Sequence, residues 1–193
     1  AIAAAQNAPV GNGGSKHRLQ SAGEYVDHGH HALIRLDAFR AIGGYDPAFT
    51  HNEAAEFDHR LRAAGHRIWL TGRTRAIYFP RDGMQALARQ YFHYGRGRAQ
   101  NLMKHRSFPR IRQLKVIAIL PFTVLAFLAP VAPLLALPVL VWMSICWAKA
   151  VSLAVSTRDA SLLAVAPSAM VMHLAWSAGY WRQIYQGNLA ARE

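Results

Sequence analysis

The C-terminal half of the chain carries long uncharged apolar stretches. Residues 116–148 contain no charged side chain, and about 20 consecutive apolar residues are enough to cross the hydrocarbon core of a membrane. The run is longer than one span requires, and Pro130 and Pro133 mark a turn inside it. We therefore predict three transmembrane helices, with a polar turn at 156–159 before the last of them, at residues 116–129, 134–155 and 160–180.

The third predicted span ends in an aromatic belt, as spans do at the membrane surface; its residues are Trp176, Tyr180, Trp181 and Tyr185. His173 inside this span is either a functional group or, more often, a side chain satisfied by a neighbouring helix. The positive-inside rule places the basic segment 96–115 on the cytoplasmic side. Three spans put the tail on the opposite side, whereas one kinked span in place of the first two returns it to the cytoplasm.

The N-terminal half has the short helices and strands, separated by turns, that are typical of an α/β domain. Asp37 and Asn52 stand where a side chain can cap a helix N-terminus, and Gly43-Gly44 ends a helix. Residues 9–15 are glycine-rich and are predicted to be a loop. The predicted helices are residues 1–7, 37–42 and 52–64, and the predicted strands are residues 24–35, 66–70 and 75–79.

A long basic helix at residues 84–104 joins the two halves. Leu87, Tyr91 and Tyr94 form a stripe along it between arginines, which suits a helix lying in the membrane interface; a surface helix packed on its own domain is the alternative. A basic linker, residues 106–115, follows it. The predicted organisation is an α/β part, an interface helix with its linker, a transmembrane part and a tail, at residues 1–82, 83–115, 116–181 and 182–193.

The chain has a net charge of +12 although 52% of its residues are hydrophobic. A basic excess suits nucleic acid, an anionic membrane surface or a phosphate-bearing substrate. The densest basic run, 96–115, adjoins the uncharged run, so membrane lipid is the favoured partner, and no recognition motif supports nucleic acid. Cys146 is the only cysteine, so no internal disulfide forms and a zinc cluster is not expected.

Candidate chemistry is concentrated at residues 51–62, HNEAAEFDHRLR. Glu53 and Glu56 lie close to one helical turn apart, while Phe57 and Leu61 form an apolar stripe that can dock the helix. Paired carboxylates behind a glycine turn suit acid–base chemistry. Carboxylates also stabilise the positive N-terminal end of any helix dipole. The alternative is therefore an ordinary surface helix, and the spacing alone favours this alternative.

Three histidines in the strand predicted at 24–35 raise a metal hypothesis. Alternation would place His28 and His30 on one face of that strand, with His31 on the other. Asp27 is the only nearby carboxylate at a supporting spacing. The favoured interpretation is therefore a strand that carries polar groups past a substrate pocket, or one with a solvated face.

The order of these motifs resembles the C-terminal half of a membrane-attached family 2 glycosyltransferase, and within that family the succinoglycan-type exopolysaccharide enzymes. Each motif is weak alone, but their order and spacing along nearly the whole chain are specific. The matching residues are Gly43-Gly44-Tyr45-Asp46, Asn52-Glu53, Glu56, Arg60-Leu61-Arg62, Pro80-Arg81 and the QYFHYGR run from Gln90 to Arg96.

The resemblance implies a GT-A α/β domain in a bacterial inner-membrane enzyme that works on the cytoplasmic side. Such an enzyme moves a sugar from a nucleotide-diphosphate donor to a lipid-linked saccharide acceptor, with inversion. It uses a carboxylate base for the acceptor hydroxyl, and a divalent cation (Mg or Mn) with basic groups for the departing diphosphate. The nucleotide-binding half with the Asp-x-Asp metal motif is expected before residue 1, so no metal ligands are assigned here.

The chain departs from the family at its base position. The family pattern is Asn-Glu-Asp, and the residue here is Ala54, which cannot accept a proton. Glu53 or Glu56 has assumed the role, or the base has been removed; Glu53 is favoured. By resemblance, the acceptor side is lined by His28, His30, Gly43, Gly44, Tyr45, Asp46 and Asn52, and the donor diphosphate meets Gln90, His93, Tyr94 and Arg96.

Ala54 also supports a rival of another class. In this interpretation the chain is a non-catalytic membrane protein whose basic helix binds anionic lipid or a partner. A base-bearing enzyme and a lipid-binding protein share the same charge pattern, so the sequence leaves both open.

Overall fold

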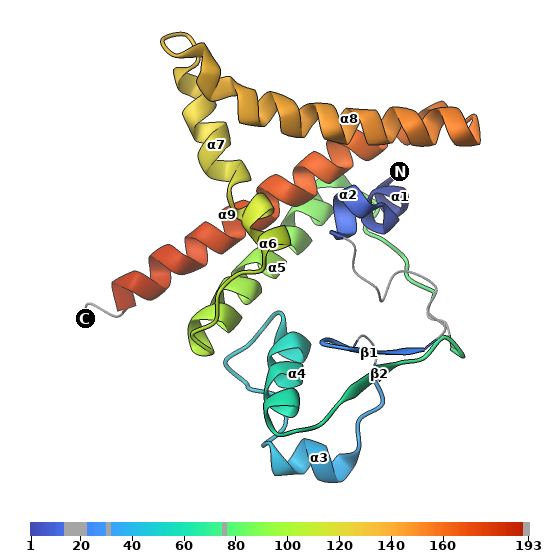
Figure 1. Ribbon diagram of the computed structural model, residues 1–193, viewed down its shortest axis with the longest axis vertical. Helices are drawn as coiled ribbons and strands as arrows, with labels where there is room; N and C mark the ends of the chain where they lie inside the picture. Colours follow the sequence, from blue (N-terminus) through green and yellow to red (C-terminus); the bar gives the residue numbers. More distant parts are fainter. Residues whose placement is uncertain (14–22, 30–31, 75–76, 191–193) are drawn as a thin grey trace.

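The computed structural model describes residues 1–13, 23–29, 32–74 and 77–190. Helices dominate it, and the described strands form one two-stranded sheet. A bundle of long helices occupies one side of the molecule, and a small part built on the sheet and two short helices lies on the other (Figure 1). The α/β character predicted for residues 1–82 is therefore restricted to this small part.

The apolar C-terminal half forms three helical stretches that are long and apolar enough to cross a membrane: Ile111–Leu128, Pro133–Thr157 and Ala160–Leu189. A turn after Leu128 separates the first two, and α7 and α8 run in different directions (Figure 1). Each stretch begins or ends a few residues from the predicted bounds. The elements are α6 (Ile111–Ile117), α7 (Ile119–Leu125), η2 (Ala126–Leu128), η3 (Pro133–Ala136), α8 (Leu137–Thr157), η4 (Ala160–Ala164) and α9 (Val165–Ala190).

Two segments predicted as a linker and a tail contain helix. The linker at 106–115 is helical from Ile111, where α6 begins; the side chain of Gln113 accepts a hydrogen bond from the Arg110 N–H at 2.9 Å and fixes that start. The tail at 182–193 is helical as far as Ala190, because α9 continues without a break.

Pro121 explains why α6 and α7 are separate helices. Proline has no N–H, so the carbonyl of Ile117, four residues earlier, loses its helical donor. The Ser177 hydroxyl and the Trp181 indole N–H on α9 both donate to that carbonyl at 2.9 Å. Ser177 also accepts from the Leu120 N–H at 3.2 Å. Side chains of α9 thus satisfy the backbone groups that the proline frees, as an apolar environment requires.

Helix α5 (Met84–Lys104) has the predicted bounds and lies alongside α9 (Figure 1). Leu87 from the predicted stripe is fully buried in a cluster with residues of α1, α8 and α9. A Cβ on Gly95 would lie 1.9 Å from the Trp176 carbonyl, and one on Gly179 would lie 2.0 Å from the Phe92 carbonyl. These glycines allow the two backbones to touch, so α5 packs on a candidate span along this face.

The N-terminal helices pack on the same bundle. Helix α1 (Ile2–Asn7) confirms the prediction for 1–7, but Pro9–Asn12 form a helix, α2, where a loop was predicted. His173 on α9 accepts from the Trp142 indole at 3.1 Å and bonds the Val10 carbonyl at 2.8 Å. Both ring nitrogens of His173 therefore have partners, which matches the satisfied-histidine interpretation.

The small part contains β1 (Glu24–Val26), β2 (Ile68–Leu70), α3 (Leu36–Ala41) and α4 (Glu53–Ala63). The strands are antiparallel, with Tyr25 opposite Trp69 and their rings in edge contact at 4.9 Å. Phe57 and Leu61 of α4 form the core as their spacing predicts, together with Ala38 and Ile68.

Several predictions for this part are wrong. The strand at 24–35 ends at Val26, the strand at 66–70 is three residues long, and the described residues 77–79 are not a strand. Residues 75–76 lie outside the described part. Helix α3 begins after Arg35, so Asp37 is in its first turn and not the cap. Asn52 is the N-cap residue of α4 but has φ 66° and makes no side-chain cap bond.

Candidate functional site

Glu56 is the centre of an ion cluster between α4 and the end of α5. Its side chain is fully buried, although the spacing alone favoured an ordinary surface helix. Arg60, one turn later, donates through Nε at 2.8 Å. Lys104 and His105 approach from the end of α5 at 2.6 and 3.1 Å.

The glycine turn before α4 is fastened to the same cluster. Gly43 and Gly44 have φ of 79° and 68°, a conformation open to glycine at no steric cost. Arg60 donates to the carbonyl of Ile42 at 2.5 Å and to that of Gly44 at 2.6 Å. Asp46 completes the cluster, because Lys104 donates to its carboxylate at 2.6 Å. The turn, α4 and α5 are thus held as one unit, in which the Tyr45 ring packs on Phe57 at 5.0 Å.

Burial and charge act in opposite directions on the Glu56 carboxyl. Burial tends to raise its pKa, but the hydrogen bonds from Arg60 and Lys104 outweigh burial and leave the pKa below its ordinary value. The pKa of Asp46 is also lowered, chiefly by its hydrogen bond from Lys104. Both carboxylates are therefore charged at neutral pH, and the oxygens of Glu56 are occupied by cationic donors.

A second group lies where the start of α4 meets the middle of α5. The rings of His51 and His93 are stacked, with centroids 4.2 Å apart and planes within 4°. Asn52 donates to the Gly97 carbonyl at 3.3 Å, and a Cβ on Gly97 would lie 2.5 Å from the His51 carbonyl. Glu53, exposed at the first position of α4, lies beside this group.

Sequence reasoning missed His51 as a member of this group. Its signal was its position directly before Asn52-Glu53, within the stretch that was singled out. The pKa of His51 is lowered by burial first and then by the nearby His93. The His51 ring is thus held neutral close to the exposed carboxylate of Glu53.

The Gln-x-x-x-aromatic signature forms a hydrogen-bonded pair on α5. Gln90 donates to the hydroxyls of Tyr94 at 2.8 Å and Tyr78 at 3.0 Å. Gln90 and His93 are three residues apart, so their side chains are neighbours on the helix surface. Arg96, three residues after His93, donates to Gln183 of α9 at 3.3 Å.

His28 and Glu53 lie on different sides of α4. Asp58 accepts from the backbone N–H of Gly29 at 2.8 Å and bonds His28 Nδ1 at 2.6 Å. Asp58 follows Glu53 by five residues, about 140° around the helix, so His28 faces another side of α4. His30 and His31 lie outside the described residues. Within the described ranges, no group of three or more His, Cys, Asp or Glu side chains is placed to hold a metal ion.

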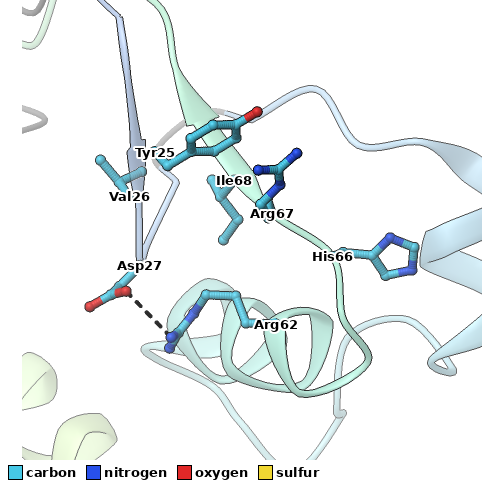
Figure 2. Close-up of a pocket in the computed structure, with 7 residues that line it drawn as sticks. All are labelled: Tyr25, Val26, Asp27, Arg62, His66, Arg67 and Ile68. Carbon is cyan, nitrogen blue, oxygen red and sulfur yellow. Dashed lines mark hydrogen bonds and ion pairs between the residues drawn. The ribbon is translucent and has the colours of Figure 1, made fainter.

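An open pocket of about 240 Å³ lies at the edge of the sheet (Figure 2). Arg62 reaches from α4 towards Asp27 at the end of β1, at 3.4 Å, and Asp27 also pairs with Arg110. The other lining residues are Tyr25, Val26, His66, Arg67 and Ile68. Among the residues that the structure describes, none of those predicted to bind donor or acceptor lines this pocket.

Comparison with known proteins supports the resemblance drawn from the motifs. Over 184 residues the chain is 50% identical to the succinoglycan biosynthesis protein ExoA of Rhizobium meliloti (strain 1021), and the match covers 95% of this chain. The chain spans only 56% of the length of that protein. No family model matches the chain. No solved structure matches it either.

Proposed function

We propose that this chain, similar over nearly its whole length to a succinoglycan biosynthesis protein, is the membrane-attached C-terminal part of a family 2 glycosyltransferase with a GT-A catalytic domain. It acts in the synthesis of a succinoglycan-type exopolysaccharide. The observation that carries the proposal is the unit formed by the glycine turn, α4 and α5, because the matched residues Gly44, Asp46, Glu56 and Arg60 all take part in it.

In the proposed reaction, a hydroxyl oxygen of a lipid-linked saccharide attacks the anomeric carbon of a nucleotide-diphosphate sugar. The bond from that carbon to the diphosphate breaks, and a carboxylate takes the hydroxyl proton. Glu53 is the better candidate for this base, because it is exposed beside the His51–His93 stack. Glu56 has a structural role instead, since Arg60, Lys104 and His105 occupy its oxygens.

We assign the acceptor and the donor to different sides of the group formed by His51, Asn52, Glu53 and His93. We assign Gly43, Gly44, Tyr45, Asp46 and Asn52 to the acceptor side. His28 and His30 are assigned there by resemblance alone, because His28 faces another side of α4 from Glu53 and His30 lies outside the described residues. On α5, Gln90, His93 and Tyr94 meet the donor diphosphate, where neutral and cationic donors stabilise the departing charge. Arg96 adds positive charge on the same helix, although its side chain is hydrogen-bonded to Gln183.

A divalent cation is expected in such an enzyme. The described residues offer no cluster of ligands that fits one, so no step on this chain is assigned to the ion. In this proposal the protein is attached to the bacterial inner membrane with the small part in the cytoplasm. The three apolar stretches support the membrane attachment, and the positive-inside rule supports the orientation.

The test is sugar transfer from labelled nucleotide sugars to lipid, in membranes containing the longer protein that carries this chain. The chain as it stands is compared with Ala54→Asp, which restores the family's base, and with Glu53→Gln. Transfer that is lost in Glu53→Gln alone identifies Glu53 as the base. Transfer that appears only in Ala54→Asp shows that this chain carries a disabled site.

The rival function is a non-catalytic lipid-binding protein. Its supporting observation is Ala54 itself, together with the basic character of α5. Absence of transfer from every donor in all three proteins, with normal membrane insertion, would favour this rival over the enzyme.

A further inference from the structure

Several hydrogen-bond donors of α4 and α5 lack acceptors among the described residues. Arg98 of α5 is partly buried, and no described residue pairs with its guanidinium. Asn101, three residues later and therefore its neighbour on the helix surface, is 3% exposed, and its Nδ2 has no partner among the described residues. The Nε of Arg62 on α4 is a third buried donor without an acceptor in the described structure.

The charges around these donors are almost all positive. Burial, and after it the neighbouring Arg110 and Arg112, lower the pKa of Arg98 to about 10. The Asp27 carboxylate pairs with Arg62 and Arg110, so it already has cationic partners. Buried donors without acceptors, such as the Nδ2 of Asn101 and the Nε of Arg62, are costly, and an anion that accepts from them would also balance the partly buried Arg98.

A phosphate group fits this set of donors. Guanidinium groups bind phosphate oxygens through paired charge-assisted hydrogen bonds, and an amide N–H₂ adds a neutral donor beside them. A phosphate carries enough acceptor oxygens to serve Arg98, Asn101 and Arg110 at once. The missing partner is therefore anionic and rich in oxygen acceptors.

The position of the group indicates where the phosphate comes from. Ile111 opens the first candidate span directly after Arg110. Phe108 is 93% exposed and Ile111 is 75% exposed, so apolar side chains stand beside the arginines. Basic residues next to a span lie at the level of lipid headgroups, and the apolar neighbours suit acyl chains.

We propose that Arg98, Asn101, Arg110 and Arg112 bind the phosphate group of an anionic membrane lipid. Arg98 follows His93 by five residues, about 140° around α5, so this site faces another side of the helix from the group at Glu53. It goes beyond the proposed sugar transfer and holds whether or not the chain takes part in that reaction.

The site is tested with the purified chain in mixed micelles of an uncharged detergent. Phosphatidylglycerol, phosphatidylcholine, inorganic phosphate and inorganic diphosphate are added in separate titrations, and bound lipid is counted by native mass spectrometry while melting is followed in parallel. Arg98→Gln is compared with Arg89→Gln, which removes the same charge from an exposed position of α5. We expect Arg98→Gln to weaken phosphatidylglycerol binding about tenfold and Arg89→Gln less than about twofold.

A second variant keeps the test informative if Arg98→Gln folds poorly. Asn101→Asp supplies an internal carboxylate beside Arg98, so it should raise the melting temperature without lipid and abolish the further rise caused by phosphatidylglycerol. Equal losses in Arg98→Gln and Arg89→Gln would overturn the site in favour of general charge attraction. Soluble diphosphate binding as tightly as phosphatidylglycerol would overturn the lipid as its source.

Discussion

Lys104 at the end of α5 places its Nζ 2.6 Å from both the Glu56 carboxylate on α4 and the Asp46 carboxylate in the preceding turn. One side chain therefore joins three segments that lie as much as 58 residues apart in sequence. The contact links the small sheet-containing part to a helix that packs on a candidate membrane span. The position of the proposed site relative to the membrane depends on this junction.

Glu56→Gln should destabilise the chain strongly. An amide cannot balance Arg60 and Lys104, and removing one partner of a buried ion pair costs about 3–5 kcal/mol. Thermal melting in detergent measures the loss. The exposed Glu53→Gln is the control and should change stability by less than about 0.5 kcal/mol. Similar losses in both variants would contradict the structural role of Glu56.

Acidification between pH 7 and pH 5 should destabilise the chain through two stacked histidine pairs, His51 with His93 and His59 with His105. Burial lowers the pKa values of His51 and His59 from 6.5, and the rings of His93 and His105 lower them further. The unfolded chain then binds more protons than the folded chain below about pH 6.5, so stability is lost as pH falls through that value. The charged groups that face them are Glu53 and Arg96 for His51, and Arg62 and Glu56 for His59.

Melting temperatures measured from pH 7.5 to pH 5 test this dependence. The Glu56 ion cluster does not interfere, because the pKa of Glu56 is lowered from its ordinary value and its stabilisation is lost only in stronger acid. The double variant His51→Gln with His59→Gln should flatten the profile above pH 5. A profile that keeps its slope in the double variant would assign the effect to other groups.

Ser177→Ala should weaken the junction of α6 and α7. The variant removes one donor to the Ile117 carbonyl and the acceptor for the Leu120 N–H, at a cost of about 1 kcal/mol. Pro121→Leu restores the helical N–H, so in that background the cost of Ser177→Ala should be smaller. A double-mutant cycle by thermal melting measures the difference; additive effects would show that Ser177 does not compensate for the proline.

Gly95→Ala should separate α5 from α9. The added Cβ would meet the Trp176 carbonyl at 1.9 Å, and backbone atoms on both sides leave no room to adjust, so the expected loss is at least about 2 kcal/mol. Gly83→Ala is the matched control, because nothing lies within 4 Å of its added Cβ. Comparable melting temperatures for the two variants would mean that the helices do not touch at Gly95.

The features that could be predicted from the sequence are those that depend on residues close to one another along the chain. The bounds of α5 and the existence of three apolar stretches follow from local periodicity and the absence of charge, because helices and membrane spans obey their own local pattern. The Phe57 and Leu61 core positions follow from the same spacing. The motif order indicated the resemblance that the comparison with ExoA supports.

The tertiary structure decided which polar groups meet. Nothing within α4 shows that Glu56 is buried against Lys104 while Glu53 is exposed, because the partner comes from a helix 48 residues later. The strands predicted at 24–35 and 66–70 are only three residues long in the structure, because residues form a strand only where a partner strand pairs with them. Local pattern determines elements, whereas burial and pairing depend on segments that are distant in sequence and meet only in the folded chain.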